Sequence, residues 1–251
     1  MSKRKLIKNI TETSADFYVY GDIVDEKVPD WWTGEISATE VDVADVRAEL
    51  EGLKGIKDLN IYINSGGGSV FASSTMVSLL KRFKQTTGAK IHSYIDGLCA
   101  SASTYLAMVA DDINVYQNSI MMIHKPMTVS MGNADDLQKD IDTLNTIEND
   151  MMIPLYMNKA KVSEDEIKEL IANETWFGGN PLRNDFIGHY FNINYLEEAK
   201  QVTASASKMF RNYKHIPEEL LKKPEQPKAD EVQKVDYSSF EDRLSSLKKG
   251  A

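Results

Sequence analysis

The sequence predicts an α/β fold, a parallel sheet with helices packed on it, and three observations lead to this class. Residues 59–63 and 90–95 are apolar runs rich in β-branched and aromatic side chains, as in buried strands. Each run is followed by a turn of small residues and then by apolar residues at helical spacing. Two further short strands are expected at residues 113–116 and 120–124. Such alternation of strands and helices is typical of a parallel sheet covered by helices.

Composition and charge limit the class of protein. The chain has 251 residues, of which 42% are hydrophobic and 27% are charged, which fits a folded domain with an appendage. The net charge of −9 argues against a broad nucleic-acid-binding face. The single cysteine excludes an internal disulfide framework. The basic N-terminus lacks the apolar core of a signal peptide, and no apolar run is long enough to span a bilayer. We therefore expect a cytoplasmic protein with neither nucleic-acid nor membrane partners.

The N-terminal part is expected to begin with a flexible segment, residues 1–15. A strand that ends in a turn follows at residues 16–23. In the polar stretch after it, Trp31 and Trp32 either cap a core or contact a neighbouring subunit, and the core is the favoured interpretation. Residues 44–53 are expected to form a short amphipathic helix.

A glycine-rich turn, Asn64-Ser65-Gly66-Gly67-Gly68-Ser69, joins the first buried strand to the next helix. Consecutive glycines allow positive φ and a close approach to a ligand, and N–H groups at a helix start favour negative charge. The run lacks the lysine of a P-loop, and Phe71 stands where the third glycine of a dinucleotide fingerprint belongs. Two interpretations of the turn remain. It binds the oxyanion of an acyl-transfer reaction, or it is a tight βα turn that takes no part in chemistry.

The C-terminal half is expected to contain a long helix over residues 133–159, capped by Asn133. Its apolar residues follow a near-heptad seam, so it either projects to contact another subunit or packs on its own core. A capping box at residues 163–166 opens a short helix, a loop-rich stretch covers 174–188, and a strand is expected over 189–195. The seam residues are Leu137, Ile141, Leu144, Met151 and Leu155.

The composition changes in the last part of the chain, where Lys, Glu, Ser and Pro dominate. Residues 201–251 are therefore expected to be a charged, flexible tail with at most one short helix over residues 240–247. The folded domain is expected to cover residues 16–200.

Ser101 lies in the predicted turn between the second strand and its helix, beside backbone N–H groups that can hold an oxyanion. Serine at such a place more often caps the helix, and Ser103 competes for both roles. Cys99 is a further nucleophile, although its small apolar neighbours favour a space-filling role.

His124 ends a strand at the sheet edge where α/β folds place their ligands. A neutral imidazole beside a serine hydroxyl can act as a general base, and an acid must then hold its tautomer. By position the candidate acids are Glu174, Asp185 and Asp165. No His or Cys cluster has metal-ligand spacing, so neither a metal nor an organic cofactor is expected. The competing histidines lack comparable surroundings; they are His92, His189 and His215.

Three segments together resemble the ClpP family of serine peptidases, over residues 16–196. The family's Asn-Ser-Pro-Gly-Gly corresponds to residues 64–68, with Gly66 in place of proline, and its Gly-x-Ala-Ala-Ser corresponds to residues 97–101. Its Met-Ile-His corresponds to residues 122–124. The family fold is the crotonase-like ββα superhelix, so the resemblance implies this fold with a long protruding helix that resembles the family's handle helix.

The resemblance also implies roles for individual residues. Ser101 would be the nucleophile and His124 the general base, while Gly68 and Ala102 would supply the N–H groups of the oxyanion hole. Glu174 would be the acid, at a place where the family usually has Asp.

Asp185 is the alternative acid, and Ser103 has no catalytic role in this scheme.

The implied activity is that of a serine endopeptidase that forms an acyl-enzyme with protein substrates, assembled as a homo-oligomeric ring, single or double. Within the family, the sequence resembles the ClpP-like proteases of tailed bacteriophages, and this resemblance implies processing of capsid and scaffold proteins during head maturation, in the host cytoplasm or the prohead. The rival functions are a crotonase-type acyl-CoA enzyme and a non-catalytic ring or scaffold assembly protein. The resemblance does not decide whether a AAA+ unfoldase docks on the ring.

Overall fold

The structure, a computed structural model, describes residues 5–29, 31–32, 34–37, 39–196, 213 and 215–216. The chain divides into two units, Met1–Pro217 and Glu218–Ala251. The second unit lies outside the described residues, and so do the helix expected over residues 240–247 and most of the expected tail. The first unit has a mixed α/β fold, as predicted.

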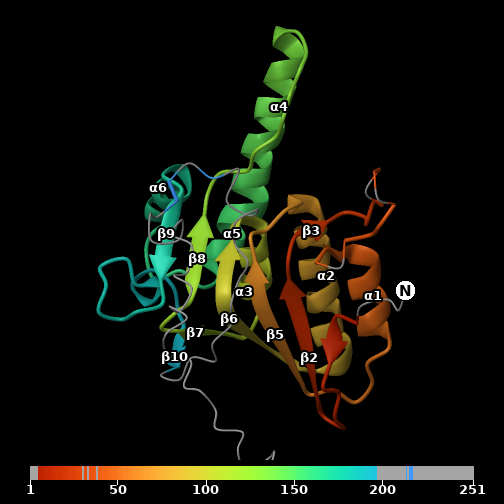
Figure 1. Cartoon of the computed structure of the whole chain (residues 1–251). Coiled ribbons are helices and arrows are strands. Elements are labelled where there is room, and N and C mark those ends of the chain that lie inside the picture. Colours follow the sequence, from red (N-terminus) through yellow and green to blue (C-terminus); the bar gives the residue numbers. More distant parts are fainter. Residues whose placement is uncertain are drawn as a thin grey trace, which may run out of the picture. The chain divides into compact units, whose positions relative to one another are not determined.

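The main sheet has eight strands among the described residues, in the order β1-β2-β5-β6-β7-β10, with β8 pairing β6 and β9 pairing β8 (Figure 1). The pairs are parallel except β1 with β2 and β8 with β9. A small sheet pairs β3 with β4. The strands are β1 (Ile7–Lys8), β2 (Ser14–Tyr20), β3 (Ile23–Val24), β4 (Val41–Asp42), β5 (Asp58–Ser65), β6 (Lys90–Ala100), β7 (Asp112–Tyr116), β8 (Ile120–Ile123), β9 (Thr175–Gly178) and β10 (Asn194–Leu196).

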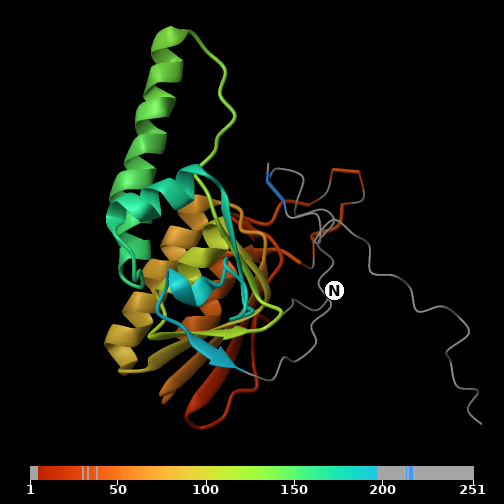
Figure 2. The same cartoon turned by 90° about the vertical axis from the view of Figure 1, so that its left-hand side faces the viewer.

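Helices α1, α2 and α3 gather on one face of this sheet (Figures 1 and 2). Short 3-10 turns at Ser101–Ser103 and Ile187–His189 interrupt the connections, and a π-helical segment at Ile147–Met152 joins α4 to α5. The helices are α1 (Val43–Glu51), α2 (Val70–Thr87), α3 (Thr104–Met108), α4 (Ala134–Thr146), α5 (Ile153–Met157) and α6 (Glu164–Ala172). No helix of the described residues combines the length and apolar character needed to cross a membrane.

Buried and partly exposed residues alternate along the central strands, so the sheet has a core face and an outer face. In β2 and β5, every second residue is buried in the core, as Phe17 and Ile61 are, because successive side chains of a strand point to opposite faces. The residues between them form a tyrosine row across the other face: Tyr18, Tyr62 and Tyr94 occupy matching register positions. Their neighbouring rings stack with centroids 5.0 Å apart.

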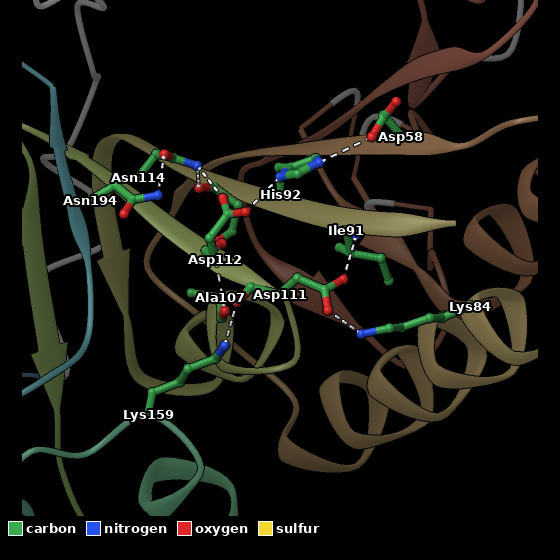
Figure 3. Close-up of polar contacts among 11 residues, drawn as sticks. Asp58, Lys84, Ile91, His92, Ala107, Asp111, Asp112, Asn114, Lys159 and Asn194 are labelled. Carbon is green, nitrogen blue, oxygen red and sulfur yellow. Dashed lines mark hydrogen bonds and ion pairs between the residues drawn. The ribbon is translucent and has the colours of Figure 1, made fainter. Parts of the chain in front are cut away.

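Polar side chains on the same face join the strands next to this row (Figure 3). Nδ1 of His92 lies 2.7 Å from Oδ2 of Asp112, and Nε2 lies 3.3 Å from Oδ1 of Asp58. The side chain of Asn114 bonds Asp112, and Asn194 donates to Asn114 at 3.3 Å. The network therefore links β5, β6, β7 and β10.

The long helix is present over residues 134–157, as α4, the π-helical segment and α5 in succession, where one helix over 133–159 was expected. The Asn133 cap is confirmed, because its Oδ1 accepts N–H bonds from Asp135 and Asp136 at 3.0 and 3.1 Å. No residue of α4 is buried, and α4 projects away from the sheet (Figures 1 and 2). Packing on the chain's own core is confirmed for α5, whose Leu155 is buried there, and not for α4.

Two N-terminal features differ from the sequence-based expectations. Residues 1–15 were expected to be flexible, yet Leu6 and Ile7 are buried and β1 pairs with β2. The side-chain carboxylate of Glu49 also accepts the N–H of Leu6 at 2.8 Å. The core interpretation of the tryptophan pair is wrong, because Trp31 is 87% and Trp32 is 79% exposed.

Three expected boundaries further along the chain also need correction. The stretch 174–188, expected to be loop-rich, contains β9, which is only four residues long. The strand expected over 189–195 is replaced by a 3-10 turn and the short β10. β6 continues to Ala100 through residues expected to form a turn, because its last part pairs with β8.

Candidate active site

Ser101 follows β6 directly and opens the 3-10 turn that leads into α3. Its φ of 54° lies in the left-handed region, which is strained for a residue with a Cβ. Among the described residues other than glycine, only Asn9 and Glu174 share a positive φ. Backbone strain of this kind tends to persist at functional sites, where the surrounding structure enforces it.

The glycine turn after β5 lies against the Ser101 turn, and this close approach requires glycine. A Cβ built on Gly67 would lie 2.7 Å from the carbonyl oxygen of Ala100 and 2.9 Å from the nitrogen of Ala102. A Cβ on Gly68 would lie 2.1 Å from the carbonyl oxygen of Ile23, and φ there is 138°. The turn is held by the Ser65 hydroxyl, which accepts the Gly67 N–H at 3.0 Å.

His124 reaches Ser101 because of sheet pairing. β8 runs parallel to the last part of β6, with Ala100 opposite Met122, so both strands end at the same edge. His124 follows β8, and its Nε2 lies 2.7 Å from Oγ of Ser101. The histidine is buried, with 8% of its surface exposed.

The surroundings of His124 set its protonation state. Burial lowers the pKa of the imidazole below its ordinary value, and the negative charge of Glu174 opposes this shift. The net direction is downward, so the ring is neutral at neutral pH. A neutral ring beside a hydroxyl can accept its proton.

Glu174 is brought to His124 by β9. β9 pairs antiparallel with β8, with Thr175 opposite Ile123. Glu174, which precedes Thr175, and His124, which follows Ile123, therefore lie at the same end of the two paired strands. Glu174 is buried and has a φ of 49°. Its Oε1 accepts the backbone N–H of His215 at 2.7 Å.

A small pocket of about 80 Å³ opens beside Ser101. Gly68, Ala102 and His124 line it together with Ser101, so the residues expected to form the oxyanion hole face the same cavity as the serine and the histidine. Further lining residues are mostly apolar: Val70, Tyr105, Pro126, Met127 and Met152, with Lys125 beside them.

Known proteins resemble this chain over part of its length. Residues 37–181 match the family model described as Clp protease. The chain belongs to the Clp protease family. Two curated relatives, both named ATP-dependent Clp protease proteolytic subunit 2, come from Synechococcus sp. (strain CC9605) and Parasynechococcus marenigrum (strain WH8102). Each is 31% identical over 90 residues, which are 35% of this chain and 44% of the relative. The match thus spans less than half the length of these relatives.

Four other sequence-based candidates do not line the pocket beside Ser101: Asp165, Asp185, His92 and His189. Asp185 is held by Arg183 through two bonds of 2.8 and 2.9 Å, and this pairing lowers the pKa of its carboxyl. Asp165 lies in the first turn of α6 and is exposed. His92 belongs to the network of Figure 3, and the Nδ1 of His189 lies 3.4 Å from a backbone carbonyl.

Ser103 and Cys99 are buried beneath the Ser101 turn. The Ser103 hydroxyl contacts the carbonyl oxygens of Ala100 at 2.8 Å and Ser65 at 3.1 Å, which fits a structural role. Burial raises the pKa of the Cys99 thiol to about 12, so it is not a thiolate at neutral pH. In the part of the chain that the structure describes, no group of three or more His, Cys, Asp or Glu residues could hold a metal ion.

Tyr213 is a site residue that the sequence analysis missed. Its hydroxyl donates to the carbonyl oxygen of Gly66, and its ring meets that of His124 edge to face, with centroids 5.5 Å apart. It lies beyond the 37–181 match to the Clp protease family, in a stretch whose composition resembles a linker. The sequence carried no signal that could have connected it to residues 66 and 124.

Proposed function

We propose that this chain is a serine endopeptidase of the ClpP type that acts through an acyl-enzyme. The observation that carries the proposal is the 2.7 Å contact between Oγ of Ser101 and Nε2 of His124, at a pocket that Gly68 and Ala102 also line. The mixed α/β sheet with its projecting helix is compatible with the ββα superhelix that the resemblance implies.

In the proposed mechanism, His124 removes the proton from Ser101 as Oγ attacks a peptide carbonyl carbon. The N–H groups of Gly68 and Ala102 stabilise the oxyanion of the tetrahedral intermediate. The imidazolium then protonates the leaving amine, and an acyl-enzyme remains. Water, deprotonated by His124, releases the acyl group and restores the serine. Glu174 stabilises the imidazolium by its charge.

The pocket favours an apolar substrate side chain. Val70, Met127 and Met152 line it next to Ser101. We propose that residues 125–131, which follow His124 and belong to no helix or strand, pair with an extended substrate through main-chain hydrogen bonds. We therefore propose protein substrates with an apolar residue before the cleaved bond.

A fluorophosphonate probe tests this function directly, since it reacts with an activated serine. We expect labelling of the wild type at Ser101, identified by peptide mapping, and no labelling of Ser101→Ala. Ser78→Ala is a matched control, because Ser78 is an exposed serine of α2 away from the pocket. Labelling that persists in Ser101→Ala, or that maps to Ser103, would contradict the assignment. An unlabelled wild type would favour the acyl-CoA enzyme, which uses the same oxyanion hole without a serine nucleophile.

We further propose that the substrates are phage capsid or scaffold proteins and that cleavage accompanies head maturation. This narrower function rests on the resemblance inferred from the sequence alone, in particular on the Glu174-Thr175-Trp176 segment. The test is mass measurement of a co-expressed capsid or scaffold protein with the wild type and with Ser101→Ala. Shortened products with the wild type alone are expected, and unchanged masses in both would contradict it.

We propose a homo-oligomeric ring in which α4 contacts another subunit. α4 has no buried residue, and its Leu137 and Ile141 are 41% and 49% exposed. The Leu137→Glu/Ile141→Glu double variant should shift sedimentation toward smaller species. Thr143→Glu/Thr146→Glu adds the same charge to exposed positions across the helix and should not. Equal sedimentation of both variants and the wild type would contradict an α4 interface.

A further inference from the structure

Tyr213 and His215 contact three separate parts of the candidate active site. The Tyr213 hydroxyl donates to the carbonyl oxygen of Gly66 in the glycine turn. Its ring packs edge to face on His124, at 5.5 Å, and on Trp176 of β9, at 5.7 Å. The backbone N–H of His215 donates to Oε1 of Glu174 at 2.7 Å. One short stretch thus contacts the glycine turn, the general base and the acid.

Each contact restrains a group whose orientation matters for the proposed reaction. Gly66 precedes Gly67 and Gly68, so a hydrogen bond to its carbonyl limits rotation of the peptides that aim the Gly68 N–H. A bond from His215 fixes one oxygen of the Glu174 carboxylate, and charge-assisted bonds of this kind are stronger than neutral ones. The Tyr213 ring packs on the imidazole and so covers part of it. Burial raises the pKa of Tyr213, so its hydroxyl stays a donor at neutral pH.

Tyr213 and His215 are not among the described residues that line the pocket beside Ser101. The described lining comes from the glycine turn, α2, the 3-10 turn after β6, α3, the segment after β8 and the π-helical segment of the long helix. A segment that blocked the site would occupy that pocket. These contacts therefore fit a segment that supports the catalytic groups.

We propose that Tyr213, together with the backbone of His215, is a positioning element that completes the active site from outside the matched Clp protease region, residues 37–181. The inference rests on the proposed serine peptidase function and assigns part of that site to the C-terminal stretch. Tyr213 acts through Gly66 and His124 and does not contact the reacting atoms.

The rate of fluorophosphonate labelling at Ser101 tests the proposal with the full-length chain. Tyr213→Phe keeps the ring and removes only the hydroxyl, and we expect labelling about fivefold slower, the rate equivalent of one hydrogen bond. Tyr213→Ala removes the ring as well, and labelling should slow more than about tenfold. Tyr190→Phe is a control, since it deletes the hydroxyl of a half-buried tyrosine that packs on Phe177 and does not line the pocket.

The pH dependence of labelling separates positioning from a general loss of stability. Burial lowers the pKa of His124, so loss of the covering ring in Tyr213→Ala should raise this pKa and move the acid limb of the profile to higher pH. In the described part of the chain, the ionisable groups near the ring are Glu174, Tyr213 and Lys125, and Lys125 is paired with Glu148 at 3.1 Å. Tyr190→Phe should leave the limb in place.

The outcomes distinguish this inference from the function on which it rests. A wild type that is not labelled contradicts the peptidase function itself. A labelled wild type with unchanged rates and profiles in Tyr213→Phe and Tyr213→Ala contradicts the positioning role alone. Faster labelling of either variant would show that the stretch obstructs the site, which also overturns the proposal. If Tyr213→Ala melts at a lower temperature, Tyr213→Phe decides, because its ring still fills the same space.

Discussion

The hydroxyl oxygen of Tyr156 lies 2.7 Å from Oγ1 of Thr104, and Oγ1 of Thr104 in turn lies 2.6 Å from the carbonyl oxygen of Ser101. Thr104 has one hydroxyl proton and donates it in the hydrogen bond to the Ser101 carbonyl, so Tyr156 must be the donor to Thr104. Both side chains are fully buried. These two hydrogen bonds connect α5 to Ser101, the residue with positive φ at the start of the 3-10 turn before α3.

The direction of these bonds predicts unequal effects of two conservative substitutions. Thr104→Val leaves the buried Tyr156 hydroxyl without its acceptor, and we expect a loss of about 1–3 kcal/mol in the free energy of unfolding. Tyr156→Phe leaves the Thr104 bond to Ser101 in place and should cost about 1 kcal/mol. Urea denaturation followed by circular dichroism measures both. A larger loss for Tyr156→Phe would contradict the inferred donor order.

Gly68 and Gly88 offer a comparison between a crowded and an open glycine of positive φ. Gly88 caps α2 with φ 70°, and a Cβ there would meet no atom within 4 Å. Gly88→Ala should therefore cost only the backbone strain, about 1–2 kcal/mol, and should keep Ser101 reactive. Gly68→Ala places a Cβ 2.1 Å from a backbone oxygen of Ile23, so the turn must move. We expect a larger drop in melting temperature and loss of fluorophosphonate labelling, and equal melting temperatures would contradict this.

Much of the site could be predicted because its parts depend on local sequence. Ser101 and His124 each follow a strand of the parallel sheet, and parallel strands bring their carboxyl ends to one edge. The glycine turn was readable from three successive glycines, whose crowding the structure explains. The Asn133 cap was likewise visible as a local pattern.

What could not be predicted depends on partners far away in the chain. β9 is too short to show alternation, and its strand character comes from pairing with β8. The contact of Tyr213 with Gly66 joins residues 147 positions apart, and no local pattern encodes such a contact. Exposure of Trp31 and Trp32 opposes the usual burial of large aromatic side chains, so composition favoured the wrong interpretation.

Replacement of Glu174 predicts a pH shift with a definite sign. Burial lowers the pKa of His124 and the charge of Glu174 raises it, so Glu174→Gln removes the opposing influence and the pKa falls further. The acid limb of the labelling profile should move to lower pH, because the neutral ring persists there. The plateau rate should also fall, since the imidazolium loses a stabilising charge. Stopped-flow labelling across pH measures both effects.

Asp185→Asn is the matched control for Glu174→Gln. Arg183 holds the Asp185 carboxylate through two hydrogen bonds. Neither residue is among the charged groups that shift the pKa of His124. Its profile should coincide with that of the wild type. A shift in Asp185→Asn with none in Glu174→Gln would transfer the role of the acid to Asp185.

The thiol of Cys99 should be inert in the folded protein. It lies at the end of β6, two residues before Ser101, and is fully buried. Burial raises its pKa to about 12, and since only the thiolate is a strong nucleophile, iodoacetamide should not modify it at neutral pH. Mass spectrometry should show one added carbamidomethyl group after unfolding in guanidinium chloride and none before. Rapid modification of the native protein that also stops Ser101 labelling would mean that the Ser101 turn opens, and would contradict the predicted inertness of Cys99.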